Sequence, residues 1–341
     1  MPSSDWSFCK LALAQHSRTF AIPIAMLQAP LERAVTAAYL LCRIADTVED
    51  NPEASAADRE RLFRLLLDVI DGNCEPSAFV DACGSISGFT SNEQQLMCGL
   101  PRVLTVFHEA PGHETAGRWI GELVRGMAIY AQRKPDADDG VMALTTLSDL
   151  DRYCYFVAGA IGHLLSELFV AELSLARSTR LRLQQFAESF GRGLQLVNIL
   201  RDMSGDLSRN VCFVPRAELA RWDLTPKDIV SPACATRVKS ALAPLFALAE
   251  RSLDEALEYV LAVPAQARDV RSFCLVPLWL AVATLRQCRV DARLLDPTAR
   301  VKLSREQVGA LIAECTSIAN DEAALRDAFR KLQAWEPVVA A

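Results

Sequence analysis

Apolar residues recur three and four positions apart through most of this chain. Residues 30–50 show the pattern most clearly, with apolar side chains at positions 34, 35, 38, 41, 44, 45 and 48. This spacing places them on one face of an α-helix. No segment alternates apolar and polar residues between hairpin turn signals, and only residues 211–214 could form a short strand. The pattern therefore predicts an all-α fold.

The expected helices extend over the whole 341-residue chain. They cover residues 30–50, 56–72, 95–110, 114–134, 146–173, 179–205, 232–262, 265–289, 305–318 and 321–333. Thr146 and Asp149 have the spacing of a capping box, which favours a helix start there. Residues 73–94, rich in Gly, Ser, Cys and Asn, are expected to form a connection. Because no repeat or Pro/Ser-rich linker divides the chain, we expect a single domain over residues 1–341, with its core at about 10–335.

Composition and charge exclude several classes of protein. The net charge of −6 argues against general nucleic-acid binding, which requires a basic face. The longest uncharged apolar run is residues 273–285, whereas a membrane span takes about 20 residues. The first residues lack the pattern of a signal peptide, and none of the eleven cysteines forms a C-x-x-C pair. We therefore expect a soluble, cytoplasmic chain with reduced thiols.

A first acidic cluster closes the helix expected at 30–50. Asp46 and Asp50 are four residues apart and share one helical face, with Glu49 beside them and Arg43 one turn earlier. Like charges at this spacing disfavour an isolated helix by a few tenths of a kcal/mol, so the arrangement needs a compensating partner. A solvated acidic face is the alternative for either cluster taken alone.

A second cluster of oxygen ligands lies far along the chain. Asn198, Asp202 and Asp206 line one face of a helix, and the preceding residues 191–201 are mostly apolar. Ligands of this kind suit Mg²⁺, which typically bridges a few carboxylates to substrate phosphates. The two clusters together predict magnesium-dependent chemistry on a phosphorylated substrate.

Four segments in order resemble the head-to-head prenyl synthases that make squalene and phytoene. They are residues 16–20 (HSRTF), 42–50 (CRIADTVED), 153–162 (YCYFVAGAIG) and 193–202 (GLQLVNILRD). The resemblance runs from about residue 16 to 315. It implies a single-domain, all-α bundle of the isoprenoid synthase type with a central apolar cavity.

Within that family the squalene branch is the most similar. Its features are matched by residues 46–50 (DTVED), 273–277 (FCLVP) and 301–305 (VKLSR), the last of which helps bind NADPH in that branch. The resemblance implies a farnesyltransferase that joins two farnesyl diphosphates head-to-head through presqualene diphosphate to squalene, using Mg²⁺ and NADPH. The alternatives are a phytoene-type, presqualene diphosphate-forming or hydroxysqualene-forming synthase without reductant, or a non-catalytic member that binds a prenyl chain.

The resemblance also implies roles for individual residues. The catalytic residues would be Tyr153, Asp46, Asp50, Asp202, Asp206 and Phe273. The substrate would be bound by Ser17, Arg18, Phe20, Arg43, Gln195 and Arg201. Mg²⁺ would be held by Asp46, Glu49, Asp50, Asn198, Asp202 and Asp206, and NADPH by Asn198, Arg201, Lys302 and Arg305. For the aromatic residues Phe20, Tyr153 and Phe273 the alternative is plain core packing, and for Lys302 an ordinary surface lysine.

The chain departs from the family pattern in three places. Gly205 stands where the second motif, D-x-x-E-D, has Glu. Residues 210–215 (NVCFVP) keep the aromatic residue and the proline of the family's loop without its usual glycines. The sequence ends without the membrane anchor that many squalene synthases carry. We expect at most peripheral membrane contact for product release and, separately, a monomer.

Overall fold

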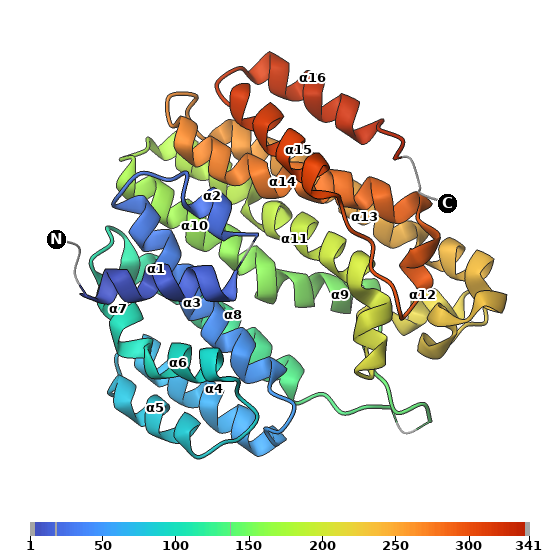
Figure 1. The fold of residues 1–341 in the computed structure, drawn as a ribbon, viewed down its shortest axis with the longest axis horizontal. Helices are drawn as coiled ribbons and strands as arrows, with labels where there is room; N and C mark the ends of the chain where they lie inside the picture. The colour runs from blue at the N-terminus through green and yellow to red at the C-terminus, as the bar shows by residue number, and fades with distance from the viewer. Residues whose placement is uncertain (1–3, 18, 137, 338–341) are drawn as a thin grey trace. The chain divides into compact units, whose positions relative to one another are not determined.

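The computed structural model describes residues 4–17, 19–136 and 138–337 (Figure 1). These residues form helices and a single pair of two-residue strands, which confirms the predicted all-α class. The chain forms two compact units, of which the first comprises Met1–Gln132 with Gly159–Glu188 and the second Arg133–Ala158 with Ser189–Ala341. The single domain expected from the sequence stays a prediction, and each unit is described by itself.

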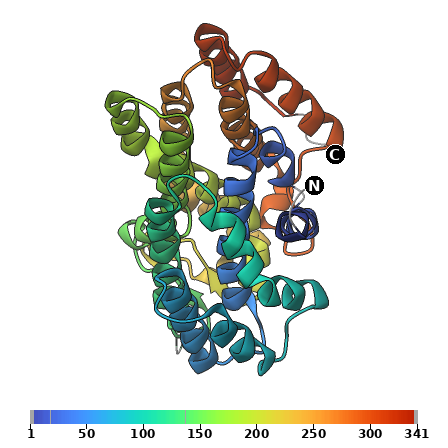
Figure 2. The ribbon, with the colours of Figure 1, turned by 90° about the vertical axis from the view of Figure 1, so that its left-hand side faces the viewer.

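The first unit is built from ten helices or parts of helices. They are α1 (Ser4–His16), α2 (Ala21–Ile24), α3 (Leu31–Asp50), α4 (Ala56–Ile70), α5 (Pro76–Gly84), α6 (Ser91–Cys98), α7 (Leu100–His108), α8 (His113–Ala131), α10 (Ala160–Glu172) and the start of α11 (Arg177–Ser208). Helix α3 packs against α1, α7, α8 and α10, and Figure 2 shows it (blue) running lengthwise through this unit. Its apolar face, including Leu40, Ile44 and Val48, is fully buried. The periodicity of residues 30–50 therefore marks the central helix of the first unit.

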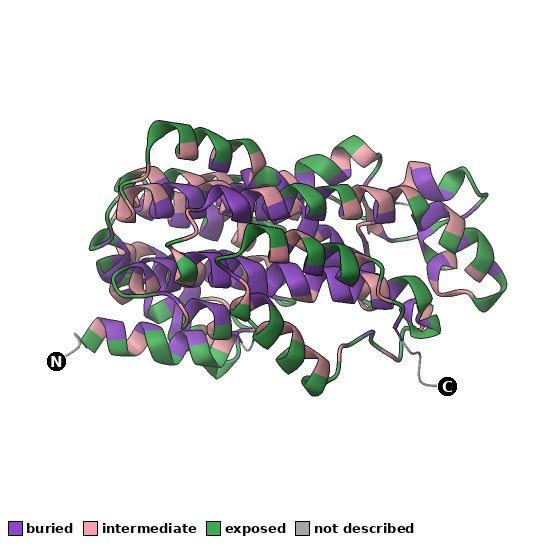
Figure 3. Cartoon of the chain, turned by 90° about the horizontal axis from the view of Figure 1, so that it is seen from above, coloured by how far each residue is buried: buried purple, intermediate pink, exposed green. Residues whose placement is uncertain are grey.

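The second unit contains the rest of α11 and the C-terminal helices. Its elements are β1 (Met142–Ala143), α9 (Leu147–Cys154), β2 (Val211–Cys212), α12 (Arg216–Ala220), α13 (Ala235–Ala262), α14 (Arg268–Val290), α15 (Arg305–Ser317) and α16 (Glu322–Gln333). Helix α14 packs against α13, α15 and α16 and is buried along most of its length. Figure 3 shows such buried residues in purple along the long helices. Helix α14 thus forms the core of the second unit.

Two apolar helical runs pass a length and composition test for crossing a membrane. They are Leu147–Glu172 and Arg268–Val290. Their most apolar windows are 67% and 78% buried inside the protein, which is what core helices of a folded protein show. The run 273–285, which the sequence analysis judged too short for a membrane span, lies within the second of them.

The structure corrects the expected connection at residues 73–94. This stretch contains α5 and the start of α6. Pro76 occupies the first turn of α5, where its missing N–H is not needed. Thr90 and Glu93 form a complete capping box at the start of α6. These short-range signals favour helix despite a composition that is typical of loops.

The family-like segment 153–162 contains a further feature that the sequence did not predict. Helix α9 passes into α10 through a π-helical turn, Tyr155–Gly159. Such turns are rare and are frequent at functional sites. Just beyond it, Gly162 lies so close to α11 that an added Cβ would stand 1.9 Å from the carbonyl oxygen of Ala187. Glycine is therefore required here by the close approach of two helices.

Replacing Gly162 should test this close approach. We expect Gly162→Ala to lower the free energy of unfolding by about 3 kcal/mol, because the methyl group forces two packed backbones apart. Gly309→Ala in α15 is the matched control, since no described atom lies within 4 Å of its Cβ position. That change should stabilise the protein by about 0.5–1 kcal/mol through helix propensity. Equal effects of the two substitutions in denaturant unfolding would contradict the assignment.

Candidate active site

The first acidic cluster lies at the C-terminal end of α3. The helix ends at Asp50, so that Glu49 and Asp50 belong to its last turn and Asp46 to the turn before. The C-terminal end of a helix carries the negative end of its dipole, which disfavours carboxylates there by about 0.3–1 kcal/mol each. Three acidic side chains therefore lie close together near the negative end of this helix dipole.

Asp46 has a perturbed pKa within this cluster. Burial, together with the nearby Asp50, raises the pKa of Asp46 to about 6 against the opposing effect of Arg43. The nearest guanidinium nitrogen of Arg43 is 3.8 Å from a carboxylate oxygen of Asp46, too far for a hydrogen bond. The buried Nε of Arg43 has no hydrogen-bond partner among the residues that the structure describes. Arg43 therefore keeps donor capacity for an anion beside the cluster.

The segment before α2 contributes polar and aromatic groups to the first unit. The Ser17 hydroxyl accepts a hydrogen bond from the Phe20 N–H at 2.9 Å. The residue Phe20 is 36% exposed, so plain core packing is excluded, and its ring centroid is 5.8 Å from that of Tyr39 on α3. Burial raises the pKa of Tyr39, and a hydrogen bond with Ser17 opposes that rise. Arg18, the predicted neighbour in this segment, lies outside the described residues.

Tyr39 is a residue that the sequence analysis missed. It lies one helical turn before Arg43, on the helix that carries the acidic cluster. The spacing of four residues from Arg43 was the available signal, but nothing in the sequence alone distinguishes it from other aromatic residues of an amphipathic helix. The structure places Ser17, Phe20, Tyr39 and Arg43 together in the first unit.

The second cluster lies at the C-terminal end of α11. Asn198 is exposed, Asp202 is half-buried and Asp206 is buried, two residues before the helix ends at Ser208. Arg201 donates to Asp202 at 2.5 and 3.1 Å, and Arg209 donates to Asp206 at 2.7 Å. Both carboxylates are thus already paired with arginines of the same region. The sequence analysis missed the pairing of Asp206 with Arg209.

The described carboxylates do not form a complete metal cage. Among residues 4–17, 19–136 and 138–337, no three His, Cys, Asp or Glu side chains are grouped to hold a metal ion together. Carboxylate oxygens lie near the C-terminal ends of α3 and α11, where a helical turn carries one or two acidic side chains. Any Mg²⁺ bound by either cluster therefore needs further ligands from water or from a bound phosphate.

Two of the predicted aromatic residues lie in the second unit. Tyr153 is buried and stacks on Phe213, with ring centroids 4.7 Å apart. Phe213 was not singled out from the sequence, because the stack joins residues sixty positions apart. Phe273 is buried in α14. Burial alone fits both core packing and a role beside substrate, so the roles of Tyr153 and Phe273 stay predictions.

The predicted cofactor-binding residues have different surroundings. Lys302 and Arg305 are exposed, and neither has a hydrogen bond or ion pair within the described chain. Arg201 is engaged by Asp202. Gln195 is half-buried one turn before Asn198. Lys302 and Arg305 therefore offer unpaired positive charge of the kind that binds phosphate.

The eleven cysteines are all free, as expected from their spacing. Cys154 and Cys274 lie inside the family-like segments and are completely buried. Burial raises the pKa of both thiols well above its usual range. A buried protonated thiol is a poor nucleophile, so thiol chemistry is not indicated at these positions.

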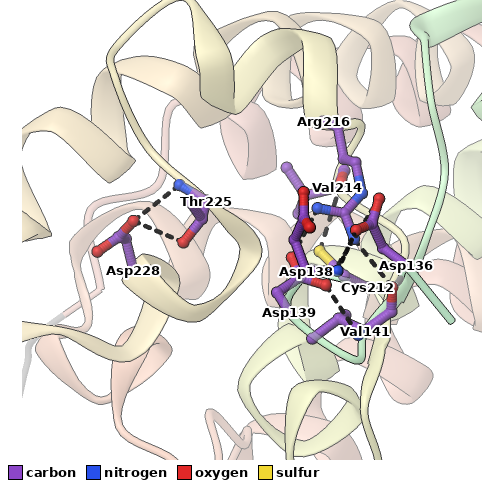
Figure 4. A network of polar contacts seen from close by, with 9 residues as sticks. All are labelled: Asp136, Asp138, Asp139, Val141, Cys212, Val214, Arg216, Thr225 and Asp228. Atoms are coloured by element: carbon purple, nitrogen blue, oxygen red, sulfur yellow. Dashed lines mark hydrogen bonds and ion pairs between the residues drawn. The ribbon is translucent and has the colours of Figure 1, made fainter.

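A polar network holds the segment that follows α11 (Figure 4). β1 and β2 pair in parallel, with Met142 opposite Val211. Arg216, the first residue of α12, donates two hydrogen bonds to Asp139 at 2.7 and 2.9 Å and one to the Val141 carbonyl at 2.9 Å. Asn210 begins the segment with a left-handed φ of 59°, a conformation open to Asn as well as Gly. Asn210 thus adopts a left-handed conformation in a loop that lacks the family's usual glycines.

The Asp139–Arg216 pair predicts a pH dependence of stability. The Arg216 guanidinium holds the pKa of Asp139 at about 2, below its usual value of 3.8. A depressed pKa stabilises the folded state fully above pH 3.8, and this contribution is lost as pH falls toward 2. Asp139→Asn should therefore be less stable than the wild type at pH 5–7. The difference should shrink between pH 4 and 2 in denaturant titrations, and a difference that is constant over this range would contradict the pairing.

Known proteins resemble this chain over most of its length. The sequence profile described as Squalene/phytoene synthase matches residues 13–307. The squalene synthase of Schizosaccharomyces pombe is 29% identical over 81% of this chain and 58% of that protein. The squalene synthase of Eremothecium gossypii is 28% identical over 88% of this chain and 66% of that protein. The solved structure of TcSQS with the ligand BPH1237 superposes with a TM-score of 0.80 at 22% identity, covering 99% of this chain and 94% of that chain.

These likenesses differ in what they establish. The structural likeness shows the fold and confirms the predicted isoprenoid synthase type. The profile match includes both acidic clusters and ends two residues beyond Arg305. The chain spans about three fifths of the length of the first curated relatives, 58% and 66% of the two described.

Proposed function

We propose the function of this chain from its family, because the chain belongs to the squalene/phytoene synthase family. It is a farnesyl-diphosphate farnesyltransferase of the squalene synthase type. It condenses C1 of one farnesyl diphosphate with C2–C3 of a second, releasing diphosphate and a proton, to give presqualene diphosphate. A second ionisation, which releases the second diphosphate, and a rearrangement would follow, and NADPH, when bound, would supply the hydride that gives squalene. The likeness to squalene synthases supports the assignment.

The observation that carries the proposal is the crowding of three carboxylates in the last two turns of α3. Asp46 and Asp50 lie near the negative end of the helix dipole, and burial, with a smaller contribution from Asp50, raises the pKa of Asp46. Such carboxylates fit a divalent cation. Asp46, Glu49 and Asp50 would hold Mg²⁺ at α3, and Asn198, Asp202 and Asp206 would hold it at α11. When bound, Mg²⁺ neutralises the charge that develops on a leaving diphosphate.

The absence of a three-residue cage in the described chain is compatible with this role. Magnesium is usually bound through one or two carboxylates together with waters and substrate phosphates, not by an all-protein cage. We infer that the diphosphate of the substrate completes each site. Arg43, with its unpaired Nε, would bind a diphosphate oxygen, and Arg201 would exchange its hydrogen bonds with Asp202 for the same purpose.

The aromatic residues would protect the allylic cation. Cations are attracted to the faces of aromatic rings, by about 2 kcal/mol or more where water is excluded. In the first unit Phe20 and Tyr39 are the candidates, and in the second unit the Tyr153–Phe213 stack and Phe273. Tyr153 is also proposed to accept or relay the proton that is lost when the cyclopropane closes, next to a released diphosphate.

NADPH would be bound by cationic and amide side chains of the second unit. Lys302 and Arg305 have unpaired charges, and Asn198 is exposed on α11. Charge-assisted hydrogen bonds from such groups suit its phosphates. The sequence has no G-x-G-x-x-G after a strand, so a Rossmann module does not supply this site.

The test of the function is product analysis with farnesyl diphosphate and Mg²⁺. Without NADPH the protein should accumulate presqualene diphosphate or its hydrolysis and rearrangement products, and with NADPH it should form squalene. Identical products in both cases would favour a synthase without reductant, the second candidate. No product in either case would favour a non-catalytic prenyl-binding protein.

Variants of the two acidic clusters test the metal assignment in the same assay. Asp46→Asn and Asp202→Asn should each lower turnover at least about 100-fold, the scale expected when charge stabilisation is lost. The melting temperature of Asp46→Asn should stay unchanged or rise, because a raised pKa makes the charged form costly at neutral pH. Asp81→Asn is the control, an exposed aspartate of α5 outside the clusters. Near wild-type turnover of either cluster variant at saturating Mg²⁺ would overturn its assignment.

A further inference from the structure

The departure of the second motif at Gly205 has a structural counterpart elsewhere in the second unit. Gly205 lies in α11 between Asp202 and Asp206, where the family motif has a third carboxylate. A Cβ built at Gly205 would stand 3.7 Å from the Nη2 of Arg300. The guanidinium of Arg300 therefore lies directly beside the helix at the point where the carboxylate is missing. The contact brings together residues from α11 and from the segment that leads into α15.

Arg300 is a cation without a partner in the described part of the chain. It is exposed, and it makes no hydrogen bond or ion pair with any residue that the structure describes. The carboxylates nearest in sequence to Gly205 are already paired, Asp202 with Arg201 and Asp206 with Arg209. Arg300 thus adds positive charge to a region whose carboxylates already have partners.

The segment that carries Arg300 is anchored by one buried residue, which has a cation on each side. Val301 is buried, at 1% exposure, and holds the backbone against the second unit. Arg300 and Lys302 on either side of it are both exposed. The buried valine fixes the position of the flanking side chains without neutralising them. Two unpaired cations on an anchored segment beside α11 are an arrangement that suits an anionic ligand.

We propose that Arg300 binds a phosphate group of a ligand held at the end of α11, and that Gly205 keeps Arg300 free to do so. The proposal rests on the proposed function, which supplies two sources of phosphate: the diphosphate of the prenyl substrate and the 2′-phosphate of NADPH. A guanidinium binds phosphate oxygens in bidentate fashion. A glutamate at position 205 would pair with Arg300 and repel the same phosphate, whereas glycine does neither.

Direct binding to the purified full chain tests the proposal without turnover. Isothermal titration calorimetry measures the affinity for each of three probes separately: inorganic diphosphate in the presence of Mg²⁺, NADPH, and NADH. Comparing the three affinities distinguishes the two sources of phosphate. Arg300→Ala should weaken binding of at least one phosphate probe by about tenfold, as expected for loss of a charge-assisted hydrogen bond. Arg300→Lys should restore part of the affinity. Arg330→Ala, which removes an exposed arginine of α16, is the control and should bind as the wild type does.

Position 205 gives a second, independent variant. Gly205→Glu should weaken the same probe as Arg300→Ala, and the double variant should be no weaker than either single one. Gly205→Gln has a similar size without the charge and should bind nearly as the wild type does. Melting temperatures of Arg300→Ala and Arg300→Lys should lie close to that of the wild type, because Arg300 has no structural partner to lose.

The outcome identifies the phosphate. Weaker binding of NADPH with unchanged binding of NADH assigns Arg300 to the 2′-phosphate, and weaker binding of diphosphate assigns it to the prenyl substrate. If Arg300→Ala and Gly205→Glu bind all three probes as the wild type does, the proposal is overturned. Since these titrations need no product, a chain that binds diphosphate through Arg300 but forms no product would refute the proposed function and leave this inference standing.

Discussion

Acidic side chains at the C-terminal ends of two long helices are the constraint around which this structure is organised. In α3 they are Asp46, Glu49 and Asp50, and in α11 Asp202 and Asp206. Carboxylates at this end of a helix face the negative end of its dipole. The two helices differ in how the charge of these carboxylates is compensated. In α11, arginines pair with both aspartates, whereas in α3 the contact of Arg43 with Asp46 is long and the pKa of Asp46 is raised.

The surrounding structure keeps these helix ends in place. The buried face of α3 packs against neighbouring helices of the first unit, among them α1, α7, α8 and α10, and this packing holds its acidic end in place. After α11, the β1–β2 pairing and the bidentate contact of Arg216 with Asp139 fix the next segment of the second unit. Packing thus holds the carboxylates at these helix ends despite their unfavourable electrostatic energy, and bound cations would lower that energy.

Much of the fold follows from local signals in the sequence, and much of the site does not. The periodicity of residues 30–50 and the i, i+4 spacing of the aspartates predicted α3 and its acidic face. The short helices within 73–98 were missed because capping at Pro76 and Thr90 outweighs composition. Tyr39, Phe213, Arg209 and Arg300 were missed because their roles depend on side-chain contacts, and two of those contacts join distant segments. A spacing pattern identifies a helix face, but the partner of that face is set by tertiary structure.

The central claim is that these carboxylates bind magnesium only together with a diphosphate. The most direct measurement is the affinity of the wild-type chain for Mg²⁺ by calorimetry, with and without a non-hydrolysable farnesyl diphosphate analogue. We predict weak binding of Mg²⁺ alone and at least about tenfold tighter binding with the analogue, since phosphate oxygens supply the missing ligands. Tight binding of Mg²⁺ without the analogue, or an affinity that the analogue does not change, would contradict the account.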